Sequence, residues 1–322
     1  MSQVLVVGSY NEDCTWRVVR APQAGETVRG RDFARAHGGK GFNQATACAR
    51  QGVATAFVAA LGHDGAGAAA HAAASAEGIT VHCQWHEDAA TGNACILVED
   101  GGQNRIVVAL GANERLDPAF LDAQEAVFAG SRILLAQLEN NLDATRRAFA
   151  LATRHGLLRL LNPAPMHDAL DAALLAQVDL LLPNETEFAL LLARVAGINI
   201  APDDLAALDD ARLHELARRL GVGSVIITLG ARGCFVSHRD GTCLADAAPC
   251  YRVAAAPARV VDTTGAGDAF CGALAATLLR LADRPLREAV EHANRCAALS
   301  TESHGAAAAP HLADVVARFG AG

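Results

Sequence analysis

A lone carboxylate follows a glycine-containing turn in the stretch VVDTTGAGDAF, residues 260–270. This stretch leads from an apolar, strand-like run through small residues into an Ala-rich helix, and Asp268 falls in the first turn of that helix. Main-chain N–H groups at a helix start have no partner within the helix, and with the helix dipole they attract anions. We therefore predict that Gly265, Ala266 and Gly267 bind a negatively charged group and that Asp268 takes a proton beside it. An acid that only caps the helix is the alternative.

A second group of glycines surrounds the only lysine of the chain. Lys40 is the single lysine among 27 Lys and Arg residues, and it lies in HGGKGFNQATACAR between Gly39 and Gly41. The phosphate-binding pattern G-x-x-x-x-G-K-[ST] is absent. A compact ammonium flanked by glycines, with Asn43 three residues later, favours contact with a ligand over a capped turn alone.

Three further clusters follow strand-like runs. In GSYNEDC, Asn11 and Asp13 alternate, so in an extended segment they share one face and can hold neighbouring hydroxyls. In PNETE, Asn184 and Glu187 have the spacing of a helix capping box, and the same pair could meet phosphate and hydrated Mg²⁺. In TLGARGC (228–234), two glycines follow a strand, where a hairpin turn is the alternative.

The elements that must position these residues alternate along the chain. Strands are predicted at 3–8, 55–61, 132–138, 157–162, 178–183 and 224–229. Helices are predicted at 41–51, 64–77, 142–155, 186–196, 203–220, 266–282 and 285–301. The alternation predicts βαβ units and an α/β fold with a mostly parallel sheet. Ligands of such sheets bind beyond the carboxyl ends of the strands, and the five clusters follow strands or lie in the candidate lid.

Two segments interrupt this alternation, at about 11–37 and 80–110. Their extended, polar and apolar stretches predict a small antiparallel sheet inserted into the α/β body, which could cover a cleft as a lid. No linker or internal repeat divides the chain, so residues 1–322 are predicted to form a single domain.

The composition excludes some partners. A net charge of −8 disfavours nucleic acid and anionic membranes, both of which need a basic surface. The nine cysteines form no C-x-x-C pair, which favours free thiols in a reducing compartment. No signal peptide or membrane span is apparent, so a cytoplasmic protein is expected.

Four stretches, GGKGFNQATACARQG, PNETE, TLGARG and DTTGAGDAF, occur in the order and approximate spacing of the ribokinase-type sugar kinases, the PfkB carbohydrate kinase family. The stretches GSYNED, PQAGETVRG, LAQLE and LNPAP extend the resemblance over nearly the whole chain. It implies a three-layer α/β/α sandwich with a small β-sheet lid that commonly forms a homodimer interface. It also implies transfer of the γ-phosphoryl group of ATP to a sugar hydroxymethyl group, with Mg²⁺ and K⁺.

The resemblance assigns roles to individual residues. It implies that Asp268 is the base and that the anion hole consists of Gly265, Ala266 and Gly267. The implied sugar contacts are Asn11, Asp13, Gly39, Lys40, Asn43 and Glu139. The implied nucleotide contacts are Asn184, Thr228, Gly230, Gly233 and Asn294. The implied metal contacts are Glu187 to Mg²⁺ through water, and the loop of Asp262 and Thr264 to a monovalent cation.

Several positions depart from the family pattern and leave the sugar open. Tyr10 and Phe42 are bulkier than expected, Asn93 replaces an apolar lid residue, and residues 301–310 differ from the second cation-binding segment. Ribose, giving ribose 5-phosphate, is expected first, with fructose, deoxyribose, a keto-deoxy acid or a nucleoside as alternatives. A non-catalytic sugar or nucleotide sensor is disfavoured by the intact GAGD stretch and Lys40. A nicotinamide oxidoreductase is disfavoured because VLVVGSYNED lacks G-x-G-x-x-G.

Overall fold

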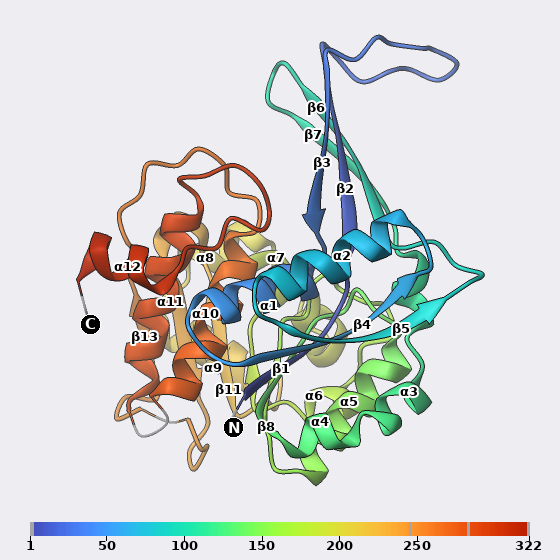
Figure 1. Cartoon of the computed structure of the whole chain (residues 1–322). Coiled ribbons are helices and arrows are strands. Elements are labelled where there is room, and N and C mark those ends of the chain that lie inside the picture. The colour runs from blue at the N-terminus through green and yellow to red at the C-terminus, as the bar shows by residue number, and fades with distance from the viewer. Residues whose placement is uncertain (1–2, 245, 282–283, 321–322) are drawn as a thin grey trace.

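Nine strands form the central sheet, in the order β13-β12-β11-β10-β9-β8-β1-β4-β5 (Figure 1). The computed structural model describes residues 3–244, 246–281 and 284–320. The strands are β1 (Gln3–Val7), β4 (Thr55–Gly62), β5 (Thr80–His86), β8 (Ser131–Ala136), β9 (Leu158–Leu161), β10 (Leu180–Leu181), β11 (Ser224–Thr228), β12 (Cys234–His238) and β13 (Cys250–Val253). Neighbouring strands are parallel from β5 to β11, whereas β11–β12 and β12–β13 are antiparallel. The predicted α/β fold with a mostly parallel sheet is confirmed.

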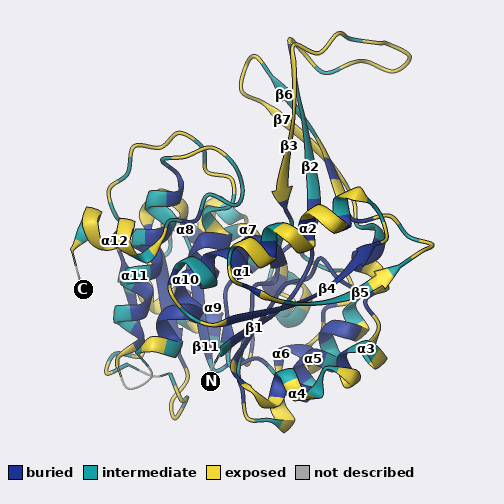
Figure 2. Ribbon diagram, in the orientation of Figure 1, coloured by how far each residue is buried: buried dark blue, intermediate teal, exposed yellow. Residues whose placement is uncertain are grey.

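Helices cover both faces of this sheet. One layer contains α1 (Lys40–Arg50), α2 (Gly65–Ala76), α10 (Ala266–Arg280), α11 (Leu286–Ser300) and α12 (Leu312–Phe319). The other contains α3 (Pro118–Ala123), α4 (Glu125–Ala129), α5 (Leu142–Arg154), α6 (Ala172–Leu175), α7 (Glu185–Leu191), α8 (Pro202–Ala207) and α9 (Asp210–Arg218). Alternate residues of β1 belong to the two cores, because successive side chains of a strand point to opposite faces. Figure 2 shows how the buried residues gather in the sheet between the layers.

The lid is a separate four-stranded sheet that projects from the body (Figure 1). Its strands, in the order β3-β2-β6-β7, are β2 (Asn11–Val18), β3 (Asp32–Gly38), β6 (Asn93–Glu99) and β7 (Asn104–Ala109). The prediction of an antiparallel sheet was wrong for the central pair, because β2 and β6 are parallel. Each insertion forms one antiparallel pair, but β2 and β6 both leave the carboxyl edge of the main sheet and therefore run the same way.

The segment 80–86 does not belong to the lid as predicted. It forms β5, which pairs in parallel with β4 at the edge of the main sheet. An edge strand is half exposed, so its alternating polar and apolar residues resemble those of a lid strand. The second insertion therefore begins after His86.

Other boundaries differ from the predicted ones. The predicted helix 203–220 is interrupted at Leu208, whose backbone is extended, and α9 begins after Asp209 caps it. Strands β12 and β13 were not predicted. Residue 282 of the predicted helix 266–282 lies outside the described residues, as do 1–2, 245, 283 and 321–322 of the predicted single domain. Within the described ranges, no helix combines the length and the apolar character needed to cross a membrane.

Candidate active site

A cavity of about 190 Å³ lies beyond the carboxyl ends of β9, β10 and β11, at the start of α10. Several predicted site residues that are distant in sequence line it together. They are Lys40 from the glycine group at 38–41, Asn184, Glu187 and Thr228 from the strand ends, and Gly265, Gly267 and Asp268 from the start of α10. The cavity therefore joins the predicted sugar side to the predicted nucleotide side.

The turn before α10 needs glycine at position 265, the N-cap of the helix. Gly265 has φ of 77°, and a Cβ there would lie 2.0 Å from the carbonyl oxygen of Ala306. The N–H of Ala266 donates to Thr263 O at 3.2 Å, so this part of the predicted anion hole is engaged within the turn. Among the described groups, the N–H of Gly265 and that of Gly267 have no backbone acceptor. These free donors can bind an anion at the helix start.

Asp268 is almost fully buried, with 7% of its surface exposed. Its Oδ2 accepts a hydrogen bond from Asn43 Nδ2 and its Oδ1 accepts one from Gln44 Nε2, both at 2.9 Å. A carboxylate can accept about four hydrogen bonds, so it retains lone pairs for a further proton. The Oδ1 of Asn43 is buried and has no partner among the described groups. An arriving hydroxyl could satisfy it.

Lys40 begins α1, directly after Gly39, whose φ of 87° favours glycine. Burial alone would lower the pKa of the Lys40 ammonium, but the charges of Asp268, Glu139 and Glu187 outweigh it and hold the pKa above its ordinary value. The ammonium is therefore charged among three carboxylates. A fixed cation at this position can hold a group that carries negative charge into the cavity.

Two further predicted sugar contacts are anchored near this point. Glu139, 9% exposed, accepts hydrogen bonds through Oε2 from Ser9 Oγ at 2.5 Å and from the Lys40 N–H at 3.0 Å. Its Oε1 has no hydrogen-bond donor among the described groups. Asn11 is held through Oδ1 by Asn113 Nδ2 at 3.0 Å, which leaves its own Nδ2 available to donate. The two side chains thus leave one acceptor and one donor free, as the predicted contacts to sugar hydroxyls require.

Asp13 follows Asn11 by two residues on β2 and is half-buried. Burial, then the charges of Glu139 and Asp268, raise the pKa of Asp13 to about 6. The three carboxylates therefore lie close enough to repel one another. The charge of Asp268, which lines the cavity, acts on Asp13, so the start of the lid lies near the cavity.

This raised pKa predicts how sugar binding depends on pH. Below about 6 the Asp13 carboxylate is protonated and cannot accept hydrogen bonds through both oxygens. We expect kcat/KM for the sugar to fall by about tenfold per pH unit below that value, because kcat/KM reports the free enzyme. The measurement is kcat/KM from pH 5 to 8 at saturating ATP. In Asp13→Asn, kcat/KM should be lower at every pH, and the fall below pH 6 should disappear. If the variant kept that fall, Asp13 would not be the group that causes it.

The nucleotide side begins at α7. Asn184 accepts from the Glu187 N–H at 2.8 Å, and Glu187 Oε2 accepts from the Asn184 N–H at 2.9 Å, so the predicted capping box is confirmed. A single parallel bridge links Asn184 to Thr228. Burial raises the pKa of Glu187 although Lys40 lies nearby. Because Glu187 lines the cavity, its part in the helix cap does not exclude the predicted contact with hydrated Mg²⁺.

Whether Mg²⁺ fits this site depends on the carboxylates that could bind it. Among the described residues no three acidic, His or Cys side chains could hold a metal together. Mg²⁺ keeps several waters and is commonly bound by one or two carboxylates with substrate phosphates. Glu187, at the cavity wall, fits that mode, so its predicted contact through water remains compatible with the structure.

Three predicted nucleotide residues lie outside the cavity. Gly230 opens a 3₁₀ turn, Gly230–Arg232, between β11 and β12. Gly233 has φ of 85°, and a Cβ there would lie 2.0 Å from Val253 O. Asn294 on α11 is 8% exposed, and its Nδ2 is 3.5 Å from Ala254 O. They gather beside β12 and β13.

The predicted cation loop also lies outside the cavity. Asp262 Oδ1 accepts from the Thr264 N–H at 2.9 Å and Oδ2 accepts from the Gly305 N–H at 3.1 Å. Burial opposes ionisation, but these hydrogen bonds outweigh it and lower the pKa of Asp262. The ionised loop is thus joined to segment 301–310, which departs from the family pattern.

The bulky residues of the sugar-side motifs do not line the cavity. Tyr10 and Phe42 are 1% and 3% exposed and pack edge to face in the core. The hydroxyl of Tyr10 shares a hydrogen bond of 2.7 Å with His37 Nδ1 on β3. Asn93 is exposed in the lid, in register with Glu12. These departures therefore fill the core and the lid without narrowing the cavity.

The structure adds residues that the sequence did not indicate. Gln44 contacts Asp268, and Asn162 and Cys271 line the cavity. Gln44 lies beside Asn43 in the same glycine cluster, and Asn162 lies in LNPAP, so position within these stretches was the only available signal.

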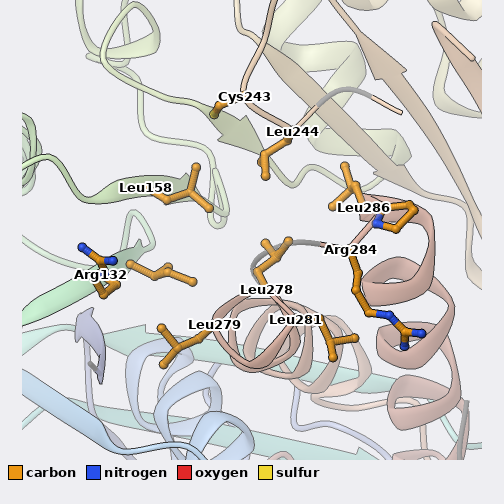
Figure 3. A pocket seen from close by; sticks show the side chains of 11 residues that line it. Arg132, Leu158, Cys243, Leu244, Leu278, Leu279, Leu281, Arg284 and Leu286 are labelled. Atoms are coloured by element: carbon orange, nitrogen blue, oxygen red, sulfur yellow. The ribbon is translucent and has the colours of Figure 1, made fainter. Parts of the chain in front are cut away.

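A different cavity, of about 340 Å³, lies at the amino ends of β8 and β9 (Figure 3). Leucines such as Leu158 and Leu278 line it, with Arg132 and Arg284 also at its wall. No carboxylate is found among the described residues that line it, and it is at the opposite end of the sheet from Asp268.

An α/β/α sandwich with a small lid and an anion-binding helix start defines the ribokinase-like class of proteins. The chain belongs to the pfkB family of carbohydrate kinases, whose model matches residues 1–312. It is accordingly a phosphotransferase with an alcohol group as acceptor.

Individual relatives resemble the chain over most of its length. A ribokinase from Haemophilus influenzae is 35% identical over 308 residues, covering 94% of this chain and 92% of the relative. The solved ribokinase of Giardia lamblia has a TM-score of 0.86 at 28% identity, covering 99% of each chain. The ribokinase of Arabidopsis thaliana, solved with ribose and ATP, has a TM-score of 0.84 at 27% identity, covering 98% of each chain.

Proposed function

We propose that the chain is an ATP-dependent ribose kinase that produces ribose 5-phosphate. The observation that carries this proposal is the position of Asp268 in a cavity whose walls also contain Lys40 and Glu187. The names of the relatives, and the ribose and ATP bound to the Arabidopsis protein, support ribose and ATP as the substrates.

The reaction begins with the ribose hydroxymethyl group beside Asp268. Asn11, Asp13 and Glu139 hold the other hydroxyls, with Gly39, Lys40 and Asn43 completing the sugar site. As the hydroxyl oxygen attacks the γ-phosphorus, Asp268 accepts its proton, and the bond from that phosphorus to the β-phosphate oxygen breaks to release ADP. The N–H groups of Gly265, Ala266 and Gly267 stabilise the transferring group, and Ala266 must first give up its bond to Thr263.

The remaining contacts belong to the nucleotide and its ions. Asn184, Thr228, Gly230, Gly233 and Asn294 are proposed to hold ATP. Mg²⁺, placed near Glu187 through water, would neutralise charge on the phosphates. K⁺ is proposed at the loop of Asp262 and Thr264, where the low pKa of Asp262 keeps a negative charge.

The test is a substrate panel with coupled detection of ADP, run with and without K⁺. We expect ribose to give the highest kcat/KM, above deoxyribose, fructose, a keto-deoxy acid and adenosine, and we expect K⁺ to raise it. A higher kcat/KM for another acceptor would show that this acceptor, and not ribose, is the preferred substrate. If sugar and ATP bind but no acceptor leads to ADP, the protein is a sensor and not a kinase.

We also propose a cytoplasmic homodimer formed through the lid. On β7, Ile106, Val107 and Val108 are 57%, 70% and 43% exposed, and on β3 Phe33 is 45% exposed. Exposed apolar residues on a small sheet favour a partner surface. Sedimentation at micromolar concentration should give twice the chain mass, and a Val107→Glu variant should give the single mass.

A further inference from the structure

We propose that Gln44 is a positioning residue that fixes the Asp268 carboxylate for proton transfer. This inference rests on the proposed function, because it gives Gln44 a purpose only if Asp268 is the base. Gln44 is 0% exposed and lies on α1, one residue after Asn43. Its Nε2 donates to Asp268 Oδ1 at 2.9 Å.

The orientation of the Gln44 amide is fixed by groups that cannot reverse their roles. Asn162 Nδ2 donates to the backbone oxygen of Leu182 at 2.8 Å, and a carbonyl oxygen can only accept. Asn162 must therefore turn Oδ1 toward Gln44, whose Nε2 donates to it at 3.1 Å. On the other side, Gln137 Nε2 donates to Gln44 Oε1 at 2.6 Å. Each hydrogen of the Gln44 amide thus has a set acceptor, and one of them is Asp268.

These contacts connect the base to the rigid part of the fold. Gln137, Asn162 and Leu182 follow the ends of β8, β9 and β10, whereas Gln44 and Asp268 lie on two helices of one layer. The strand ends therefore determine which way the carboxylate faces. Asn43 also holds Asp268, but Asn43 is a proposed sugar contact and its Oδ1 awaits a donor. Gln44 is buried, so its hydrogen bond can keep Asp268 Oδ1 occupied while Asp268 Oδ2 meets the sugar hydroxyl.

The experiment compares two substitutions of Gln44 in the full-length protein with ribose and ATP. Gln44→Met removes the donor and keeps the approximate side-chain length. We expect kcat to fall by about 10- to 100-fold, the usual scale for misplacing a catalytic group by about 1 Å. KM for ATP should stay within about threefold. Gln44→Glu, which is nearly isosteric but replaces the donor with a negatively charged acceptor, should lower kcat at least as far.

A buried glutamine at the carboxyl end of the same helix supplies the matched control. Gln51 is 1% exposed, donates to Pro310 O at 2.8 Å, and lies 2.7 Å from His292 Nε2 through Oε1. Gln51→Met removes two partly buried hydrogen bonds, where Gln44→Met removes three buried ones. It should therefore also lower Tm while leaving kcat unchanged. A purely structural role for Gln44 predicts equal kcat in both variants.

The outcomes separate this inference from the proposed function. If the unmodified protein phosphorylates ribose and either Gln44 variant that folds retains full kcat, the inference alone fails. If the unmodified protein forms no ADP with any acceptor, the proposed function fails first. A crystal structure of Gln44→Met should show the Asp268 carboxylate rotated about its last bond, and an unchanged carboxylate would also overturn the inference.

Discussion

Replacing Asp268 by Asn is expected to lower kcat by about 10²–10⁴-fold, the usual contribution of a general acid or base. The amide cannot accept the proton of the attacking hydroxyl. It also presents an NH₂ group where both neighbours, Asn43 and Gln44, already donate. KM for ribose and for ATP should change much less than kcat, because the loss occurs in the transition state.

The control is another carboxylate at a helix start. Asp171 caps α6 by accepting from the Leu174 N–H at 2.9 Å, and its other contact is an ion pair with Arg146. Asp171→Asn should therefore leave kcat unchanged. Asp268→Ala provides a second variant without the opposed donors. If Asp268→Asn and Asp268→Ala both fold and keep near-normal turnover, another group must take the proton.

Much of the fold could be predicted because its signals are local. Parallel strands and the helices between them alternate with a clear apolar pattern, and the helix predicted at 64–77 begins after Asp64, which caps α2. The errors arose where tertiary context decides. β5 has the half-exposed pattern of an edge strand, which does not reveal the sheet to which it belongs. The break at Leu208 interrupts a helical pattern that continues on both sides.

The same distinction applies to the site. The anion-binding helix start, the glycines and Asp268 are local features, so short stretches of sequence reveal them. Gln44 is different, because a polar residue inside a helix usually faces solvent. Its partners Gln137, Asn162 and Asp268 lie 93, 118 and 224 residues away in the sequence. Only folding brings them together, so no pattern within one segment could identify this contact.

Removing the charge of Lys40 is the second change with a large expected effect. Asp268, Glu139 and Glu187 hold the pKa of Lys40 above its ordinary value, so the ammonium offsets part of their negative charge. In Lys40→Met the transferring phosphoryl group would meet three uncompensated carboxylates. We expect kcat/KM to fall by about 10²–10³-fold, the scale for losing one stabilising donor at a developing charge. Lys40→Arg should recover only part of this, because its planar fork differs from a compact ammonium.

The composition allows the same prediction to be checked without mutation. Because Lys40 is the only lysine, an amine-specific acetylating reagent can reach only this side chain and the N-terminal amine. Acetylation removes the charge, so activity should fall in proportion to the fraction of peptide 40 that is modified. Bound ribose and ATP should slow that modification, because they occupy the cavity that Lys40 lines. Full activity after complete acetylation of Lys40 would show that its charge takes no part in phosphoryl transfer.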